Sequence, residues 1–417
     1  MQMLLNTLLA RTVKRGHLTV VMRSGRSFVY GDLTGKSVRI RLTSRMWQAR
    51  VTIYPQLRLG EAYMNEGLVF EEGTIADLLD LIARNFARPP KWIRRSTNLR
   101  MWIIRHLKQN APWRSRRNVA HHYDLDARLY DLFLDSDLQY SCGYFRSPRM
   151  SLEAAQAAKK KHITAKLYIK PGQRVLDIGS GWGGLALDIA EKEDVEVVGI
   201  TLSSEQLAAA SSRARERKLD HKVRFCQKDY REVSERYDRI VSVGMFEHVG
   251  RDHWDTFFRK CFELLHHDGV LLLHTIGRLD GPGESNPWVI RYIFPGGHLP
   301  SLSDLSRSVE RSGFITADIE VLRLHYAHTL RHWRRRFLSN TAKLRELYDE
   351  KFIRMWEFYL ASFESSFRYQ GLAVLQIQLI KHHGALPITR EYVYDQKHEG
   401  KDNYKNERTL GAGLRKA

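Results

Sequence analysis

The pattern of apolar and polar positions divides the chain into a strand-rich beginning, a regular middle and a helical, aromatic end. Residues 18 to about 53 contain short β-rich runs, HLTVVM, SVRIRLT and ARVTIY, separated by Gly and Ser turns, which predicts a small sheet. Thr74 is a suitable helix cap for IADLLDLIARNFA, whose apolar positions recur at helical spacing until Pro89 and Pro90. This first part is therefore expected to form an α+β unit.

The middle of the chain alternates regularly between strand and helix patterns after Ser151, a predicted helix cap for LEAAQAAKKKHITAKLYI. Five buried-type strands are predicted at RVLDIG, VEVVGIT, HKVRFCQ, YDRIVSVG and GVLLLHTIG. Helical runs separate them at GLALDIAEK, SEQLAAASSRARER and WDTFFRKCFELLHH. This alternation predicts a parallel, doubly wound sheet, with ligands at the carboxyl ends of its strands.

The last third is expected to be helical from about residue 322, with long segments at HYAHTLRHWRRRF and RMWEFYLASFESSFRYQGLAVLQIQLI. These segments could roof a pocket over the sheet or serve as ordinary core helices, and periodicity does not separate the two. Residues from about 393 to 417 form a polar tail that is expected to fray.

Composition limits the class of protein and of partner. With 417 residues and 43% hydrophobic content, the chain can bury a sizeable core in two domains. Lys and Arg total 67 against 47 Asp and Glu, so the formal charge is +20, which favours an anionic partner. Cys142, Cys226 and Cys261 are too few and too far apart for a disulfide framework or a CxxC metal site, so no metal is predicted and a reducing cytosol fits best.

No run of about eighteen apolar residues occurs, so any membrane contact is expected to be peripheral. The apolar N-terminal residues precede basic ones, the reverse of a signal peptide. Residues 81–123 contain no acidic residue but eleven Lys or Arg, together with Trp92, Trp102 and Trp113. Such a segment can lie on an anionic bilayer, at up to ~1 kcal/mol per cation, or can be a solvated linker helix. Charge alone also leaves nucleic acid open.

The sequence VLDIGSGWGG places Gly179, Gly181 and Gly183 in the first strand-to-helix turn, where missing side chains let the backbone approach a ligand. Gly179, Gly181 and Gly184 also satisfy the dinucleotide pattern GxGxxG, so NAD or FAD must be considered. That cofactor class requires an acid at the end of the second strand, but this strand ends in Gly-Ile-Thr201.

A methyltransferase interpretation explains Asp177, a polar residue within an apolar strand, as an organiser of the loop that holds the methionine part of S-adenosylmethionine (SAM). The alternative for Asp177 is a purely structural turn. Asp229, after HKVRFCQ, could accept a hydrogen bond from the adenine amino group, or could simply cap a helix or turn.

Several runs together resemble a specific family. They are HHYDLD, QYSCGYF, VLDIGSGWGG, GITLSSEQ, QKDYRE, RIVSVGMFEHVG, LLHTIG, YIFPGGHLPS and HYAHTLRHWRRRF, in this order over most of residues 115–380. They resemble cyclopropane-fatty-acyl-phospholipid synthases and the related mycolic acid cyclopropane synthases. Upstream, RLGEAYMNEG at 58–67 resembles the N-terminal lipid-binding domain of the phospholipid enzymes.

The resemblance implies an α/β, class I SAM-dependent methyltransferase fold: a Rossmann-like, doubly wound sheet with a smaller N-terminal α+β lipid-binding domain and helical insertions over the active site. The expected domains are 1–112, lipid- and membrane-binding with a basic linker, 113–392, catalytic, and 393–417, the polar tail. The SAM contacts implied by resemblance are Tyr123, Tyr140, Ser141, Gly179, Gly181, Thr201, Leu202, Gln206, Asp229 and Tyr230.

The resemblance also implies a bicarbonate site. The matching positions are Cys142, Glu247, His274, Ile276 through its backbone, and Tyr326. In the implied reaction, a methylene group passes from SAM to a cis double bond of an unsaturated phospholipid acyl chain, through methyl transfer, a carbocation and deprotonation by bicarbonate. Aromatic residues expected to stabilise the cation are Phe246, Tyr140, Tyr144 and Tyr326.

The chain departs from the family at one position. The family carries a cysteine in a helix of the form YLxxCxxxFR, whereas this chain has YLASFESSFR, with Phe363 at that position. Two outcomes therefore stay open besides cyclopropane formation: a methyltransferase that makes a branched methyl product, and a non-catalytic membrane-binding paralogue. A methyltransferase for nucleic acid or a small amine is a further alternative.

The expected partners are unsaturated phospholipids of an anionic membrane surface, without nucleic acid, and a homodimer is expected by resemblance only. The expected location is cytoplasmic and peripheral, on the inner face of the membrane.

Overall fold

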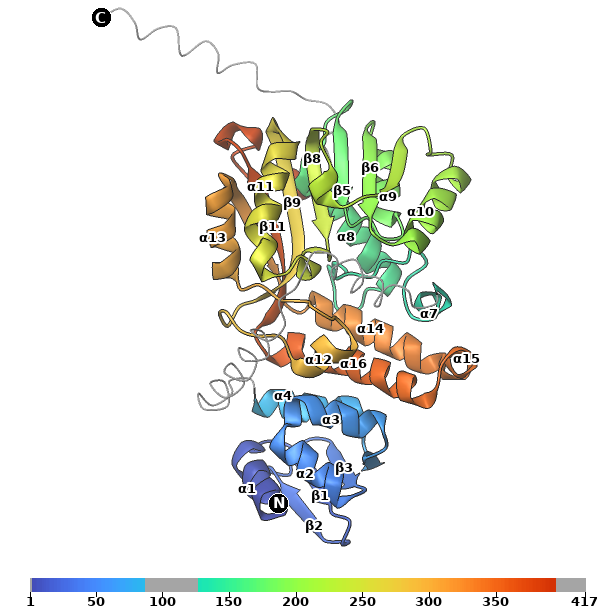
Figure 1. Ribbon diagram of the computed structural model, residues 1–417, viewed down its shortest axis with the longest axis vertical. Coiled ribbons are helices and arrows are strands. Elements are labelled where there is room, and N and C mark those ends of the chain that lie inside the picture. Colours follow the sequence, from blue (N-terminus) through green and yellow to red (C-terminus); the bar gives the residue numbers. More distant parts are fainter. Residues whose placement is uncertain (1, 87–126, 395–417) are drawn as a thin grey trace, which may run out of the picture.

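Three tiers stack along the long axis of the molecule (Figure 1). The computed structural model describes residues 2–86 and 127–394. A small α+β unit forms one end, a large α/β unit forms the other, and a layer of helices lies between them (Figure 1). The expected α/β class with an additional N-terminal α+β unit is confirmed.

The N-terminal unit is a four-stranded sheet covered by helices. Its elements are α1 (Gln2–Thr12), β1 (His17–Val21), β2 (Ser27–Tyr30), β3 (Ser37–Leu42), α2 (Arg45–Ile53), α3 (Pro55–Met64), β4 (Leu68–Glu72) and α4 (Ile75–Asn85). The strand order is β2-β1-β3-β4. As predicted, Thr74 caps α4, and Thr74 and Asp77 form a capping box. The helix ends at Asn85, and Pro89 and Pro90 lie outside the described residues.

One predicted strand of this unit is wrong, because ARVTIY lies in the helix α2 and the turn after it. The side chain of Ser44 caps α2 by accepting a hydrogen bond from the backbone N–H of Trp47. Gln48 and Thr52 are the buried positions of α2, one turn apart. The cap and the tertiary packing therefore override the β propensity of the run VTI.

The large unit is built on a seven-stranded sheet in the order β10-β11-β9-β8-β5-β6-β7. Its strands are β5 (Arg174–Ile178), β6 (Glu196–Thr201), β7 (Val223–Gln227), β8 (Tyr237–Val243), β9 (Leu265–Arg278), β10 (Ile315–Leu322) and β11 (Leu372–Ile380). The five predicted strands are all present, and β7, β6, β5, β8 and β9 pair in parallel. The parallel, doubly wound core is confirmed.

The sheet also contains an antiparallel strand that the sequence analysis assigned to a helix. The segment LAVLQIQLI was expected to continue the last long helix, but it forms β11, antiparallel to both β9 and β10. The preceding helix ends at Tyr369, and Gly371 follows, where a Cβ would lie 2.6 Å from Cγ of Asp280. A short apolar run buried on both faces has no periodicity that distinguishes a strand from a helix.

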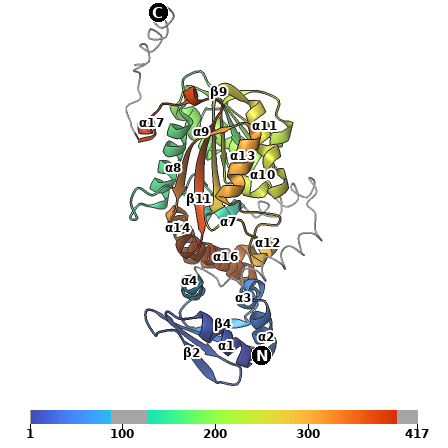
Figure 2. The same ribbon diagram turned by 90° about the vertical axis from the view of Figure 1, so that its left-hand side faces the viewer.

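Helices cover both faces of the sheet (Figure 2). One face carries α8 (Leu152–Leu167), α9 (Gly184–Lys192) and α10 (Ser204–Glu216), and the other carries α11 (Trp254–Leu264) and α13 (Leu302–Ser312). Ser151 caps α8 as predicted, since its side chain accepts a hydrogen bond from the N–H of Ala154.

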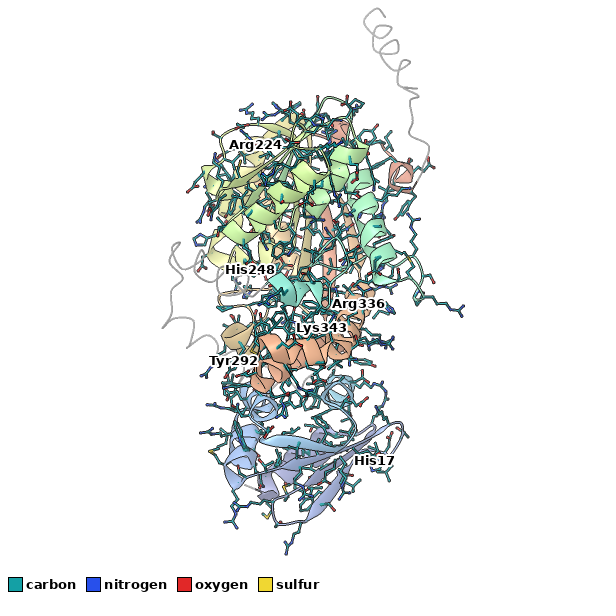
Figure 3. The ribbon with its side chains drawn as sticks, turned by 90° about the vertical axis from the view of Figure 1, so that its right-hand side faces the viewer. His17, Arg224, His248, Tyr292, Arg336 and Lys343 are labelled. Carbon is teal, nitrogen blue, oxygen red and sulfur yellow. The ribbon has the colours of Figure 1, made fainter. Side chains whose placement is uncertain are left out.

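The middle tier consists of α12 (Pro287–Tyr292), α14 (His325–Ser339), α15 (Thr341–Leu347) and α16 (Glu350–Tyr369), with the short α7 (Ala127–Asp131) nearby. These helices lie at the carboxyl ends of the strands, and α3 and α4 pack against α16 from the other side (Figures 1 and 2). The Tyr63 hydroxyl donates to Glu357 at 2.6 Å, and the Tyr292 hydroxyl donates to Glu61 at 2.9 Å. Figure 3 shows Tyr292 between the middle tier and the N-terminal unit. The N-terminal unit is therefore joined to the middle tier by partly buried polar contacts as well as a shared hydrophobic core.

The described part of the chain ends in α17 (Glu391–Tyr394), so most of the predicted polar tail lies outside it. The same is true of most of the basic, tryptophan-bearing segment at 81–123. None of the helices in the described ranges combines the length and the apolar character needed to cross a bilayer.

Candidate active site

Two adjoining cavities open at the carboxyl ends of the parallel strands. The first, of about 170 Å³, lies over β5, β6 and β8. The second, of about 300 Å³, lies between the sheet and the middle tier. Tyr140, Ser141, Gly244 and His248 line both, so a ligand in one cavity can reach the other.

The glycine-rich turn after β5 forms one wall of the first cavity. Gly179 and Gly181 have φ angles of 82° and 54°, in the region that favours glycine. A Cβ on Gly179 would lie 2.7 Å from Cβ of Met245. Gly183 was predicted to touch the cofactor, but it is not among the residues that line the cavity. It is the N-cap residue of α9 and leaves room for the Phe225 ring, 2.7 Å from where its Cβ would be.

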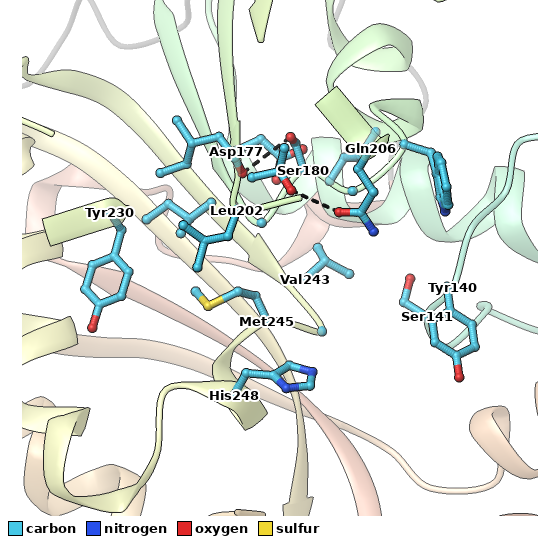
Figure 4. Close-up of a pocket in the computed structure, with 18 of the residues that line it drawn as sticks. Tyr140, Ser141, Asp177, Ser180, Leu202, Gln206, Tyr230, Val243, Met245 and His248 are labelled. Atoms are coloured by element: carbon cyan, nitrogen blue, oxygen red, sulfur yellow. Dashed lines mark hydrogen bonds between the residues drawn. The ribbon is translucent and has the colours of Figure 1, made fainter. Parts of the chain in front are cut away.

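Asp177 lies at the end of β5 and lines the first cavity (Figure 4). Its side chain is buried, and its Oδ2 has no hydrogen-bond partner in the described part of the chain. Burial raises the pKa of this carboxyl to about 7, an effect that the charge of Lys159 opposes. A cationic ligand would stabilise the ionised carboxylate, so the position fits the positively charged methionine end of SAM.

The predicted cofactor residues Leu202, Gln206 and Tyr230 also line the first cavity and follow the strands β6 and β7 (Figure 4). Thr201, at the end of β6, donates a hydrogen bond to Gln206 Oε1 at 2.9 Å, and Leu202 lies between them in sequence. Asp229 and Tyr230 follow β7. The Asp229 carboxylate accepts two hydrogen bonds from the guanidinium of Arg231, at 2.9 and 2.6 Å. The predicted contact of Asp229 with adenine stays a prediction, and Tyr123 lies outside the described residues.

The segment 139–142 forms the wall between the two cavities and is anchored from several sides. The Tyr140 hydroxyl lies 2.9 Å from that of Tyr359, and the Tyr140 ring stacks on Trp333 at 5.1 Å between centroids. Gln156 and Lys159, both on α8, hold the segment from below through its backbone and side-chain oxygens. A segment fixed in this way can present Tyr140 and Ser141 to both cavities.

The structure brings together all five residues expected around bicarbonate. The residues Cys142, Glu247, His274, Ile276 and Tyr326 line the second cavity. Glu247 Oε1 accepts a hydrogen bond from the N–H of Ile276 at 2.6 Å. The backbone donor of Ile276 is thus already used to hold the Glu247 carboxyl group.

Burial disfavours the charged forms of the ionisable groups in this cluster. Burial raises the pKa of Glu247 and lowers that of His274 well below its usual value. Burial also raises the pKa of the Cys142 thiol. Glu247 Oε2 is buried and has no hydrogen-bond partner in the described residues. Bicarbonate carries both a hydroxyl donor and acceptor oxygens, so its chemistry fits this set of groups.

Sequence reasoning missed Gln376, which is fully buried on β11. Its side-chain Nε2 lies 3.1 Å from Nδ1 of His274, the residue opposite it on β9. Because this contact uses Nδ1, Nε2 of His274 remains available to a ligand in the second cavity. The available signal was the pair of polar residues, Gln376 and Gln378, in an otherwise apolar run.

Two aromatic residues expected to face the carbocation lie elsewhere. Phe246 is fully buried among Trp254, Phe257 and Phe258, and Tyr144 stacks on His162 and His325. Neither lines the second cavity. The aromatic residues that do line it are Tyr140, Phe294, Tyr326, Tyr359 and Phe363. The expectation for Phe246 and Tyr144 is therefore wrong, because chain proximity to the strand ends does not determine which way a ring packs.

The fold and the first cavity define a SAM-dependent methyltransferase. Residues 110–377 match the family model described as mycolic acid cyclopropane synthetase, and the chain belongs to this family. It is 43% identical over 256 residues to the cyclopropane-fatty-acyl-phospholipid synthase of Escherichia coli K12, an alignment that covers 61% of this chain and 65% of that protein.

Two further similarities extend this result. The chain is 33% identical over 392 residues to a tuberculostearic acid methyltransferase of Mycobacterium tuberculosis, over 90% of each chain. A crystal structure of a mycolic acid cyclopropane synthase complexed with SAH and CTAB superposes with a TM-score of 0.60 at 34% identity. That superposition covers 63% of this chain and 97% of the other. A SAM-dependent modification of lipids is the common activity of these relatives.

Proposed function

We propose that this protein transfers a methylene group from SAM to cis double bonds of unsaturated phospholipid acyl chains and so makes cyclopropane fatty acids. The observation that carries the proposal is the second cavity, where Glu247 and His274 meet beside Tyr326, next to the SAM cavity. The similarity to a cyclopropane-fatty-acyl-phospholipid synthase supports the same substrate class.

The residues of the second cavity have distinct parts in this reaction. SAM, when bound, supplies an activated methyl group, and bicarbonate, when bound, supplies a small base. Tyr140 and Tyr326 place aromatic rings along the cavity, where they stabilise positive charge on the acyl chain without forming a bond to it. Glu247 Oε2 and His274 Nε2 hold the bicarbonate base through hydrogen bonds that involve its hydroxyl proton. Burial excludes water, which would otherwise trap the cation.

The cavity wall also suits an acyl chain. Extraction from a bilayer exposes apolar surface worth ~0.8 kcal/mol per methylene, which an apolar pocket restores. Val289 and Ile290 of α12 line the cavity with Phe294 and Phe363. Gln56 of α3 also lines it, so the N-terminal unit contributes directly to the site.

The proposed partner is an anionic membrane that contains unsaturated phospholipids. The formal charge of +20 and the basic segment at 81–123 support it. A peripheral position on the inner face of the membrane, and a homodimer, belong to the same proposal.

Phe363 is the one feature that favours a different product. It lines the second cavity at the position where the family has a cysteine, and it packs against Phe294 and Tyr359 with ring centroids 6.0 and 5.2 Å away. A bulky ring there could hold the alkene away from the base, so that methyl transfer ends in a branched chain. The intact cluster around Glu247 favours ring closure over this alternative.

The test is to incubate the purified protein with SAM and vesicles of unsaturated anionic phospholipid, and to analyse the released fatty esters by mass spectrometry and NMR. We expect a product heavier by one CH2, without the alkene and with a cyclopropane ring. A branched or methylene-bearing chain of the same mass would identify the alternative methyltransferase. No product, despite proven SAM and vesicle binding, would identify a non-catalytic protein. Vesicles of saturated phospholipid are the matched control.

A further inference from the structure

Lys159 of α8 is a fully buried ammonium group directly beneath the wall between the two cavities. Its Nζ donates hydrogen bonds to Gln139 Oε1 at 2.6 Å and to Ser141 Oγ at 2.7 Å. In the part of the chain that the structure describes, no carboxylate forms an ion pair with it within 4.0 Å. The ammonium group is therefore hydrogen-bonded to neutral oxygens of the wall, and burying its charge there lowers the stability of the fold.

The charged and titratable groups around Lys159 come from four elements. They are Lys160 on α8, Asp135, Asp137 and Cys142 on the segment before α8, Asp177 on β5, and His274 on β9. Asp137 is already neutralised by Lys160 and Arg213. Asp135 is then the carboxylate whose charge most offsets that of Lys159, but it forms no ion pair with Lys159 within 4.0 Å and accepts hydrogen bonds from the N–H groups of Gln139 and Asp137 instead. The positive charge of Lys159 is therefore offset only in part, and it acts on groups of both cavities.

Among the described residues that line the second cavity, none is an uncompensated cation near the proposed bicarbonate. His274 is held neutral by burial, and burial lowers the pKa of His248 to about 4. Arg278 also lines the cavity, but its guanidinium is paired with Asp280 at 2.9 Å. A bound anion beside the Glu247 carboxyl group therefore needs a positive charge from behind the wall.

The hydrogen bond to Ser141 has a second consequence. An ammonium group can only donate, so Ser141 Oγ accepts from Lys159, and the hydroxyl proton of Ser141 is left to donate elsewhere. Ser141 lines both cavities. Lys159 therefore orients the Ser141 hydroxyl as a donor toward the ligands while it holds the Gln139 and Ser141 side chains of the wall in place.

We propose that Lys159 is a positioning residue that supplies the positive charge for anion binding in the second cavity and fixes Ser141 between the two ligands. The inference rests on the proposed function, because the anion is the bicarbonate of that reaction. Burial lowers the pKa of Lys159 to about 8, so its charge is present at pH 7 and is lost as the pH rises through 8. Anion affinity falls over the same range.

The experiment compares Lys159→Met and Lys159→Gln with the wild-type protein by calorimetric titration of sodium bicarbonate, without SAM, at pH 7 and pH 9. Lys161→Gln is the matched control, since Lys161 is an exposed residue of the same helix. Thermal unfolding of each variant verifies that it is folded. Two variants are used because Gln can keep a hydrogen bond to Ser141 without the charge, whereas Met keeps neither.

We expect both Lys159 variants to bind bicarbonate at least about tenfold more weakly at pH 7, and Lys161→Gln to bind within about twofold of wild type. Wild-type affinity falls between pH 7 and pH 9, and that of Lys159→Met stays flat. Titration with S-adenosylhomocysteine tests the second role, the fixing of Ser141. We expect Lys159→Gln to retain more of the affinity for S-adenosylhomocysteine than Lys159→Met.

Two results would overturn the inference, and they are distinguishable. If the wild-type and Lys159 variants bind bicarbonate equally, the charge of Lys159 has no part in anion binding, while the proposed function stands. If the wild-type protein binds no bicarbonate, the bicarbonate base of the proposed function fails, and the role of Lys159 fails with it.

Discussion

The two cavities share a wall but are built in different ways. The first is assembled from the ends of neighbouring parallel strands, within residues 138–253. The second takes residues from all three tiers: Gln56 from α3, His274 from β9, Tyr326 from α14 and Phe363 from α16. A cofactor site can thus be a local property of strand-to-helix turns, whereas the substrate site here exists only after distant segments have packed together.

The cavities also differ in electrostatics. In the first, Asp177 has a pKa near 7 and can meet a cationic ligand with a negative charge. In the second, burial keeps Glu247 protonated to a higher pH and His274 neutral to a lower one. The first cavity is therefore suited to a charged cofactor, and the second to an apolar chain with a single small anion. The following four changes test whether the two cavities can be altered independently.

The largest effect is expected for Glu247→Gln. The Gln side-chain oxygen can still accept the N–H of Ile276, so the local fold is kept, but a donor replaces the unpaired Oε2. We expect kcat to fall by about 10²- to 10³-fold, in the range for loss of a group that acts in proton transfer. S-adenosylhomocysteine affinity, measured by calorimetry, should stay within about twofold of wild type. A large loss of that affinity would mean that the cavities are not independent.

The converse change is Gly179→Ala, in the first cavity. Its Cβ would lie 2.7 Å from Met245, and its φ of 82° is strained for alanine. We expect S-adenosylhomocysteine affinity to fall by about 10- to 100-fold, which corresponds to about 1.4 to 2.7 kcal/mol. Gly172→Ala is the control, since Gly172 has a similar φ of 77° with no atom within 4 Å of its Cβ. Gly172→Ala should lose about 1 kcal/mol of stability and Gly179→Ala at least as much, because of its added contact with Met245, and only Gly179→Ala should lose cofactor affinity.

A smaller effect is expected for Asp177→Asn, which should weaken cofactor binding but stabilise the folded protein. The folded protein holds the Asp177 proton up to about pH 7, whereas the unfolded chain releases it near pH 4. The free energy of unfolding is therefore highest below pH 4, where both states hold the proton, and it falls as the pH rises toward 7. Asp177→Asn should be more stable than wild type by about 1 to 2 kcal/mol at pH 8 and little changed at pH 4.

Urea unfolding at the two pH values measures the stability of Asp177→Asn, and calorimetry measures its cofactor affinity. We expect S-adenosylhomocysteine to bind about fivefold more weakly, because the amide lacks the negative charge that would attract the ammonium group of the ligand. Equal stability at pH 8 would show that Asp177 is ionised at little cost in the ligand-free protein.

The smallest effect on rate is expected for Phe363→Leu. This change enlarges the second cavity beside Phe294 and Tyr359, so it should alter which acyl chains and double-bond positions react, with total turnover within about threefold. Phe367→Leu is the control: Phe367 is buried one turn further along α16 but does not line the cavity. Product profiles from mixed-lipid vesicles provide the measurement. An identical profile for Phe363→Leu and wild type would remove Phe363 as a specificity determinant.

The difference between the cavities also explains which predictions held. Strand periodicity located β5 to β9, and the glycine-rich turn placed Gly179 and Gly181 against a cavity. Such features depend on neighbouring residues, so local sequence determines them. Gly183 was the exception, since whether a glycine faces a ligand or a packed ring depends on Phe225, more than forty residues away.

The amino-acid sequence by itself determined the methyltransferase core, the caps at Ser151 and Thr74, and the identity of the residues around Glu247. Only the tertiary structure decided that α2 is a helix and β11 a strand, that Phe246 is core, and that Gln376 and Lys159 support the two cavities. The physical reason is that a buried polar group has a role only through its partners. Those partners, such as His274 for Gln376, lie on other segments of the chain.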